Sequence, residues 1–317
     1  MTNHKNLKVL VFGAGAIGSY FGGRLAQSGN AEVAVVCRSD YEHVKTNGYQ
    51  INSIKNDFHF MPSGVYRNAA DYPGTPDLLI VATKVLPDSD IAGLIAPAVG
   101  EHTVLMLIQN GLGMEEEMQT AFPDHEIFGA IAYIGVCKTG RGVIEHQGGG
   151  KIQIGRFPEG SSPILDILTE SWLKTGVECR QSNDIIKDRW AKLVWNAPYN
   201  PISILAGGLD TGKICADPQL DELCAAVMNE VCVVAKACGK ELPATIIQDN
   251  LNYTHNFPPY KTSMLVDYEN SRPLEVEAIL GSIVRRASEK KVAVPHLRTI
   301  YALLKSVNLN HCHPIKT

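Results

Sequence analysis

Short apolar runs and segments of helical periodicity alternate through the first half of the chain. Apolar runs occupy residues 8–12, 33–37, 77–82 and 103–108, and residues 17–27 have the spacing of a helix. Buried runs of this length that alternate with helices are typical of a parallel sheet covered on both faces. The pattern therefore predicts an α/β fold with an amino-terminal doubly wound sheet.

A glycine triplet interrupts the apolar pattern farther along. Residues 143–146 and 151–154 are strand-like and flank glycines 148–150. Because glycine favours tight turns, we expect an antiparallel hairpin around this triplet, at the edge of the sheet.

Strand-like patterns disappear beyond about residue 183. Asp217 and Pro218 supply an N-cap and a first-turn proline, and helical spacing then continues to residue 238. Further helical patterns cover residues 276–287 and 297–307. We therefore predict two domains: residues 1–182 with the sheet, and residues 183–317, which are all helical.

Composition excludes several classes of partner. A net charge of −4 and a pI near 6.2 give no basic surplus for nucleic acid. No apolar run reaches the roughly 18 residues of a membrane span, and residues 1–8 do not resemble a signal peptide. The eight cysteines show no Cys-x-x-Cys spacing, so we expect reduced thiols and a cytoplasmic location.

The first predicted strand leads into a dinucleotide fingerprint, Gly-x-Gly-x-x-Gly, at Gly13, Gly15 and Gly18. There the first glycine permits a tight turn, the second admits the pyrophosphate, and the third lets helix and strand pack closely. The helix N-terminus at Ala16 and Ile17 would face the phosphates. We predict a Rossmann domain; the alternative is a glycine turn that only packs a helix on a sheet.

The second predicted strand leads into Arg38, where NAD-binding chains usually have a carboxylate. A guanidinium attracts the 2′-phosphate of NADP(H), whereas a carboxylate repels it. We therefore predict NADP(H); the alternative is a solvated surface arginine. Lys84 and Asn110 follow the third and fourth strands, so both are expected at the ligand-binding edge of the sheet.

Polar residues recur at helical spacing in the second half. Lys192 and Asn196 are four residues apart, so they share a helix face, and Asn200 follows. A cation and an amide one turn apart suit a small 2-keto acid, which presents a carbonyl oxygen and a carboxylate. Glu275, at the start of a predicted helix, could hold Lys192 in position. The alternative for this set is a solvated face or a domain interface.

An ordered series of motifs along almost the whole chain resembles the ketopantoate reductase family. It comprises the glycine fingerprint, Ala82-Thr83-Lys84, Gln109-Asn110-Gly111-Leu112-Gly113, Lys192-x-x-x-Asn196-x-x-x-Asn200-Pro201, Thr262-Ser263-Met264 and Glu275. The resemblance implies a Rossmann domain joined to a helical domain, with the active site between them. It also implies hydride transfer from NADPH to ketopantoate, giving pantoate for pantothenate and coenzyme A.

The resemblance further implies a role for each residue. Arg38 would contact the adenosine phosphate, Lys84 would line the cofactor, and Asn110 would line both cofactor and substrate. Lys192 would be the general acid, supported by Glu275. The substrate's hydroxyl and carboxylate would be held by Asn196, Asn200 and Ser263.

Two residues depart from the family pattern. Pro198 removes a helical hydrogen bond, so we expect a kink that turns Asn200 away from the Lys192 face. Asp210 stands where many members have a substrate-facing asparagine. A carboxylate there would repel a keto acid, so either Asp210 faces elsewhere or the substrate differs.

Two other functions remain open. One is a related NADPH-dependent reductase of another small 2-keto acid, since β-hydroxyacid dehydrogenases also combine a Rossmann domain with a helical Lys-x-x-x-Asn pair. A non-catalytic NADP(H)-sensing protein would keep Arg38 but would not need Lys192 and Glu275 together. The triplet at residues 311–313, His-Cys-His, is expected to be a disordered tail, and we predict no metal site. The apolar helices could serve either a core or a homodimer.

Overall fold

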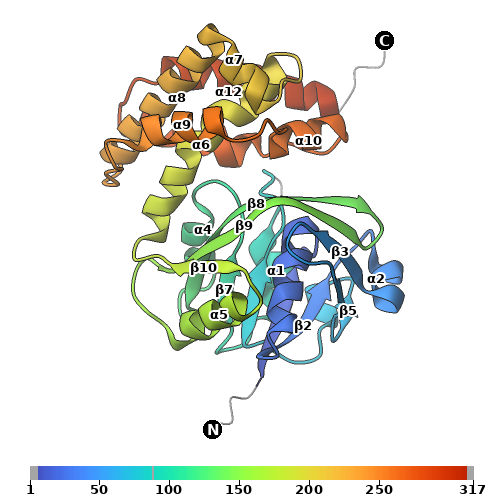
Figure 1. Ribbon diagram of the computed structural model, residues 1–317. Coiled ribbons are helices and arrows are strands. Elements are labelled where there is room, and N and C mark those ends of the chain that lie inside the picture. The colour runs from blue at the N-terminus through green and yellow to red at the C-terminus, as the bar shows by residue number, and fades with distance from the viewer. Residues whose placement is uncertain (1–5, 88, 313–317) are drawn as a thin grey trace. The chain divides into compact units, whose positions relative to one another are not determined.

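The computed structural model describes residues 6–87 and 89–312, and the chain divides into two compact units (Figure 1). The first unit comprises residues 1–84, 89–109 and 114–185, and the second comprises residues 85–88, 110–113 and 186–317. The two short segments, 85–88 and 110–113, leave the first unit and join the second. The pattern of apolar residues does not predict that these two segments belong to the second unit.

Strands and helices alternate in the first unit. Its elements are β1 (Leu7–Phe12), α1 (Ala16–Gln27), β2 (Ala31–Val36), α2 (Tyr41–Asn47), β3 (Tyr49–Ser53), β4 (Phe58–Phe60), β5 (Val65–Tyr66), η1 (Ala69–Asp71), β6 (Leu78–Val81), α3 (Ile91–Ile95), η2 (Ala96–Ala98), β7 (Val104–Leu107), α4 (Met114–Ala121), β8 (Ile127–Gly140), β9 (Val143–Phe157), α5 (Pro163–Lys174) and β10 (Glu178–Gln181). The strands expected at residues 8–12, 33–37, 77–82 and 103–108 are β1, β2, β6 and β7.

The ten strands form one mixed sheet in the order β4-β3-β9-β8-β7-β6-β1-β2-β5, with β10 beside β9. The pairs β3–β4 and β8–β9 are antiparallel, and the other pairs are parallel. Val9 and Val11 pack in the core that α1 covers, and Leu10, which points to the other face, is also fully buried. Burial on both faces explains the continuous apolar runs and confirms the predicted fold class.

The glycine triplet is not a turn, so the hairpin prediction was wrong in two respects. Residues 143–157 form one strand, β9, whose hairpin partner is β8, and the chain reverses near Gly142 instead. Gly149 and Gly150, with φ of 69° and 105°, lie where the register shifts opposite Tyr133. Glycine supplies positive φ at a bulge as readily as at a turn. β9 also lies inside the sheet, between β8 and β3.

Between residues 186 and 312, the regular elements of the second unit are all helices. They are α6 (Ile185–Leu205), α7 (Thr211–Ala216), α8 (Pro218–Ala237), α9 (Ile246–Asn256), α10 (Ser263–Glu269), the π-helical turn η3 (Glu277–Gly281), α11 (Ser282–Glu289) and α12 (Pro295–Cys312). Asp217 caps α8 as predicted, because its side chain accepts from the amides of Gln219 and Leu220. Helix α8 buries Val227, Val231 and Val234 in the core of this unit.

Residues 311 and 312 of the carboxy-terminal triplet belong to a helix, whereas the sequence predicted a disordered tail. Helix α12 extends to Cys312, and the His311 ring stacks on Tyr268 at 4.5 Å. Residue 313 lies outside the described residues. Among residues 6–311 the seven cysteines are free thiols. None of the helices described is both long enough and apolar enough to span a membrane.

A buried carboxylate joins two helices of the second unit. Glu230 of α8 accepts from the amides of His296 and Leu297, at 3.0 and 2.8 Å, at the first turn of α12. These amides have no partner within their own helix, and the positive end of the helix dipole favours a carboxylate. Glu230 therefore acts as a cap supplied from a neighbouring helix.

We predict that Glu230→Ala destabilises the second unit by about 2–4 kcal/mol, because two hydrogen bonds to a buried charge are lost. The shift in the urea unfolding midpoint, followed by circular dichroism, measures this. Glu222→Ala, at an exposed position on the same helix, is the matched control and should change stability by less than about 0.5 kcal/mol. Equal effects of the two substitutions would contradict the capping role.

Candidate functional site

The three fingerprint glycines lie in two kinds of steric surroundings in the first unit. A Cβ at Gly13 would lie 2.5 Å from Thr83 Cγ2, and one at Gly18 would lie 2.6 Å from the carbonyl oxygen of Gly13. A Cβ at Gly15 would meet nothing within 4 Å. Two glycines therefore permit close packing, and the middle one leaves open backbone that a pyrophosphate can approach.

The glycine loop is tied to the end of β2. The amides of Gly13 and Ala14 both donate to the carbonyl of Val36, each at 3.2 Å, and the Tyr49 hydroxyl donates to the carbonyl of Ala14. Helix α1 then starts at Ala16 without a side-chain cap. Its first amides, including that of Ile17, belong to the turn that a phosphate would occupy, so the loop fits a dinucleotide.

Arg38 is exposed and lies beside a hollow of about 240 Å³ just beyond β2. Arg67 and Arg141 line the same hollow, together with the Ser39 hydroxyl. Glu42, which pairs with Arg67 at 2.5 Å, is the acidic residue among those that line it. Three guanidiniums around one small hollow suit a doubly charged phosphate.

The ends of β6 and β7 are joined by a side chain that the sequence did not single out. Gln109, just after β7, donates from Nε2 to the carbonyl oxygen of Thr83, just after β6, at 3.0 Å. Lys84 follows Thr83 directly and is partly buried. In the first unit Lys84 therefore stands at the carboxyl edge of the sheet, as predicted.

Three of the predicted residues meet within the second unit. Lys192 of α6 donates from Nζ to Asn110 Oδ1 at 2.8 Å, and Asn110 Nδ2 donates to Glu275 Oε2 at 3.3 Å. The other Glu275 oxygen accepts from the Val85 amide at 3.1 Å. Because an ammonium can only donate and a carboxylate only accepts, the two ends of this chain fix the orientation of the Asn110 amide.

Asn110 reaches Lys192 because its segment packs on the π-helical turn η3. Gly111 has a φ of 103°, and a Cβ there would overlap the carbonyl oxygen of Ala278. Leu112 is buried in the core of the second unit. Glu275 lies just before this helical segment, and its carbonyl accepts from the amide of Ile279. Asn110, which accepts from Lys192, and Glu275, which accepts from Asn110, are thus both anchored to this helical segment.

The Lys192 ammonium is held in a desolvating environment. Burial lowers the pKa of Lys192 from its usual value to about 8, the neighbouring Arg189 charge lowers the pKa further, and the Glu275 carboxylate opposes both. Arg189 is itself buried on α6, one turn before Lys192. A lysine of this pKa exchanges its proton near neutral pH far more readily than a solvated one.

Asn196 and Asn200 are both buried on α6, at 7% and 1% exposure. Helix α6 continues through Pro198 and Pro201 to Leu205, and the expected turn of Asn200 away from the Lys192 face stays a prediction. The buried Asn200 Oδ1 has no hydrogen-bond partner among the residues that the structure describes. Ser263, by contrast, is exposed at the start of α10.

Asp210 has a structural role in the helical unit. Its side chain accepts from the Lys213 amide at 2.8 Å and caps α7. An aspartate is favoured at this position because it satisfies an amide that the helix leaves free.

The sequence patterns point to no role for Arg67 or Arg141, and they include Gln109 only as part of a motif. Arg67 follows the two-residue strand β5, which is too short to stand out in the apolar pattern, and Arg141 lies in the turn between β8 and β9. Gln109 precedes Asn110 in a motif that was noted, and its position at a strand end was the available signal.

Comparison with known proteins gives concordant matches over both units. Two family models match, "Ketopantoate reductase PanE/ApbA" over residues 9–159 and "Ketopantoate reductase PanE/ApbA C terminal" over residues 184–308. The chain is similar to the 2-dehydropantoate 2-reductase of Nostoc sp., with 34% identity over 303 residues and 94% coverage of each chain.

Solved structures agree with this match. A crystal structure of 2-dehydropantoate 2-reductase from Methylococcus capsulatus is 42% identical with a TM-score of 0.91, covering 98% of this chain and 99% of the other. The corresponding protein from Geobacter metallireducens is 32% identical with a TM-score of 0.89, covering 95% and 100%. With both family models and these relatives spanning almost its full length, the chain belongs to the ketopantoate reductase family of oxidoreductases.

Proposed function

We propose that this protein reduces 2-dehydropantoate (ketopantoate) to pantoate with NADPH, in the cytoplasmic route to pantothenate and coenzyme A. The observation that carries the proposal is the hydrogen-bonded series Lys192–Asn110–Glu275. It holds a partly buried ammonium, with a pKa near 8, in a fixed position on α6. A ketone reductase needs such a group, because the oxygen gains negative charge as the carbonyl carbon accepts hydride.

Lys192 acts as the general acid in this proposal. Its ammonium hydrogen-bonds the keto oxygen and then transfers a proton from Nζ to that oxygen as it becomes a hydroxyl. Asn110 keeps Nζ in position, and the Glu275 carboxylate favours the protonated amine. The neutral amine regains its proton from solvent in the next cycle.

Asn200 and Asn196 recognise the substrate. Among the described residues, no donor reaches the buried Asn200 Oδ1, and a buried acceptor without a partner costs about 1–3 kcal/mol. The terminal hydroxyl of ketopantoate would supply that donor, whereas pyruvate and 2-ketoisovalerate have no such hydroxyl. Ser263, exposed at the start of α10, would reach the carboxylate.

The first unit holds the cofactor. The glycine loop at Gly13 and Gly15 would hold the pyrophosphate, and Lys84 would line the site. Arg38, with Arg67 and Arg141, would hold the 2′-phosphate that distinguishes NADPH from NADH. Bound NADPH supplies the hydride.

Arg38→Ala should weaken NADPH binding about 10- to 100-fold while leaving NADH binding nearly unchanged, because one charge-assisted contact is worth about 1.5–3 kcal/mol. Fluorescence titration with the two cofactors measures the ratio. Arg180→Ala is the control, since Arg180 is an exposed arginine of the same unit outside the hollow. An unchanged NADPH-to-NADH ratio in Arg38→Ala would exclude Arg38 as the phosphate ligand.

Lys192→Ala should lower the turnover of ketopantoate by about 10²–10⁴-fold, the usual contribution of a general acid. NADPH binding should persist, because the glycine loop and Arg38 belong to the other unit. Lys187→Ala, which removes an exposed lysine of the same helix, should retain turnover. Near-normal turnover in Lys192→Ala would show that another group protonates the product.

The rate of reduction should be constant below the pKa of Lys192 and fall as the pH rises through about 8, because the amine then loses the proton that it must donate. Glu275→Gln removes a charge that raises this pKa, so the alkaline limb should move to lower pH. Steady-state pH profiles measure both effects. Glu269→Gln, at an exposed glutamate, should leave the limb in place; a shift in this control alone would argue against the assignment.

A further inference from the structure

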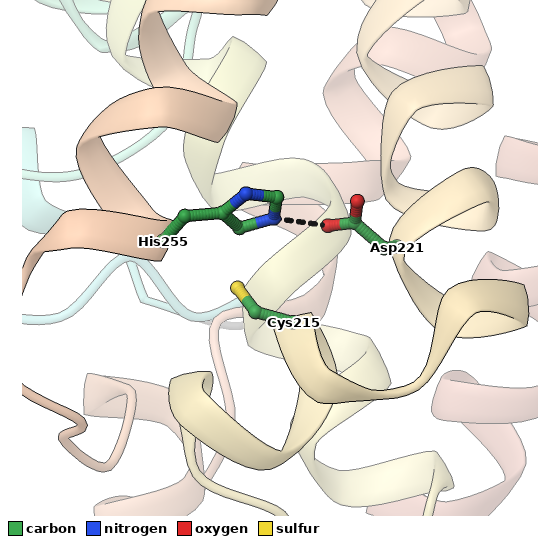
Figure 2. A group of neighbouring side chains, drawn as sticks. All are labelled: Cys215, Asp221 and His255. Carbon is green, nitrogen blue, oxygen red and sulfur yellow. Dashed lines mark hydrogen bonds and ion pairs between the residues drawn. The ribbon is translucent and has the colours of Figure 1, made fainter.

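A second group of chemically reactive side chains lies elsewhere in the helical unit. Cys215 of α7, Asp221 of α8 and His255 of α9 converge, and their sulfur, carboxylate oxygen and ring nitrogen atoms lie within 4.8 Å of one another (Figure 2). His255 Nε2 is 2.9 Å from Asp221 Oδ1. The proposed reductase mechanism uses none of these residues.

The three donor atoms lie close enough together to bind one tetrahedral zinc ion after small side-chain movements. Zinc binds thiolate at about 2.3 Å and nitrogen or carboxylate oxygen at about 2.0–2.2 Å, so neighbouring ligands are about 3.3–3.8 Å apart. His255 Nε2 and Asp221 Oδ1 are 2.9 Å apart, and all three donor atoms lie within 4.8 Å of one another. Side-chain rotations of about 1 Å would therefore bring the donors to the ideal spacing.

The charges also favour a divalent cation. A thiolate, a carboxylate and a neutral imidazole together carry the two negative charges that balance Zn²⁺. His255 lies in the last turn of α9, where the negative end of the helix dipole favours cations. The His255 and Asp221 side chains are 41% and 25% exposed, which gives an ion a path from solvent.

The helices that carry the three side chains are fixed independently of them. Asp217 ends α7 and caps α8, so the corner between Cys215 and Asp221 is held by hydrogen bonds. Next to His255, Thr254 Oγ1 accepts from Trp195 Nε1 and donates to the carbonyl of Asn250. Ligands on fixed helices lose little freedom when a metal binds.

We propose that Cys215 Sγ, an Asp221 carboxylate oxygen and His255 Nε2 form a zinc site, with water as the fourth ligand. On binding, the Cys215 thiol releases its proton to solvent, and the His255 ring carries its proton on Nδ1. This site is independent of the proposed reductase activity. The ion would join α7, α8 and α9 beside α6, which Cys215 also contacts through the Tyr199 hydroxyl at 3.8 Å.

Cobalt titration of the full-length, chelator-treated protein tests the proposal. Co²⁺ should bind one equivalent per chain and give the near-ultraviolet absorption of a thiolate–cobalt bond together with the visible bands of a tetrahedral ion. Added Zn²⁺ should displace it and abolish both signals. Zn²⁺ should also raise the thermal unfolding midpoint of the wild-type protein.

Variants assign the ligands. Cys215→Ser should abolish the thiolate–cobalt absorption, while His255→Gln and Asp221→Asn should weaken Zn²⁺ binding by at least about 100-fold. His255 is a partly exposed side chain, so His255→Gln should fold normally, as its zinc-free unfolding midpoint would show. Cys232→Ser and Cys312→Ser are the controls and should bind as the wild type does.

Two results would overturn the proposal. One is the absence of a thiolate–cobalt signal in the wild-type protein at saturating Co²⁺. The other is a signal that survives Cys215→Ser and disappears in Cys312→Ser, which would assign the bound metal to the carboxy-terminal histidine–cysteine triplet.

Discussion

A desolvated ammonium is stable in a protein only where oxygen atoms are placed to accept its hydrogen bonds, and Lys192 of the helical unit is one such group. Lys192 donates to the side-chain oxygen of Asn110, and the Asn110 amide nitrogen donates to Glu275. The second Glu275 oxygen accepts from the Val85 amide. These four residues lie far apart in the sequence. Segments 85–88 and 110–113 therefore group with the helical unit and not with the sheet unit, and they complete the surroundings of Lys192.

This arrangement also accounts for the chemistry that we propose. Burial and Arg189 lower the pKa of Lys192, Glu275 limits that effect, and the balance is a pKa of about 8. A fully solvated lysine would hold its proton too tightly at neutral pH, and a buried one without a carboxylate would be deprotonated. The Asn200 acceptor, which has no partner among the described residues, is proposed to favour substrates that bring a hydroxyl donor.

The sequence predicts the parts of the fold that depend on local periodicity. Strand β6 was predicted from a short apolar run. Helix α8 was predicted from Asp217 and Pro218, which lie at its start. Both signals are local in the sequence. The prediction of a turn at the Gly148–Gly150 triplet was wrong because glycine is favoured in bulges as well as in turns. Pro198 was expected to kink its helix; α6 runs through it to Leu205, and the kink itself stays a prediction.

The parts of the candidate sites that could not be predicted depend on contacts between residues far apart in the sequence. The spacing of Lys192 and Asn196 places them on one helix face, but nothing local shows that Asn110 packs beside Ala278 and so reaches Lys192. Arg67 and Arg141 join Arg38 only through the folded sheet. The expectation of no metal site considered the adjacent residues 311–313, whereas Cys215, Asp221 and His255 come from three different helices.

The most direct test of the account is the rate of NADPH oxidation with a series of keto acids, followed optically. Ketopantoate and 2-ketoisovalerate differ by the hydroxymethyl group that Asn200 is proposed to recognise, and pyruvate and oxaloacetate complete the series. The account predicts that kcat/KM for ketopantoate exceeds that for 2-ketoisovalerate by at least about 100-fold, because the latter leaves a buried acceptor without a donor. Equal rates for the two would contradict the substrate assignment, and no NADPH oxidation with any of the four would contradict the reductase itself.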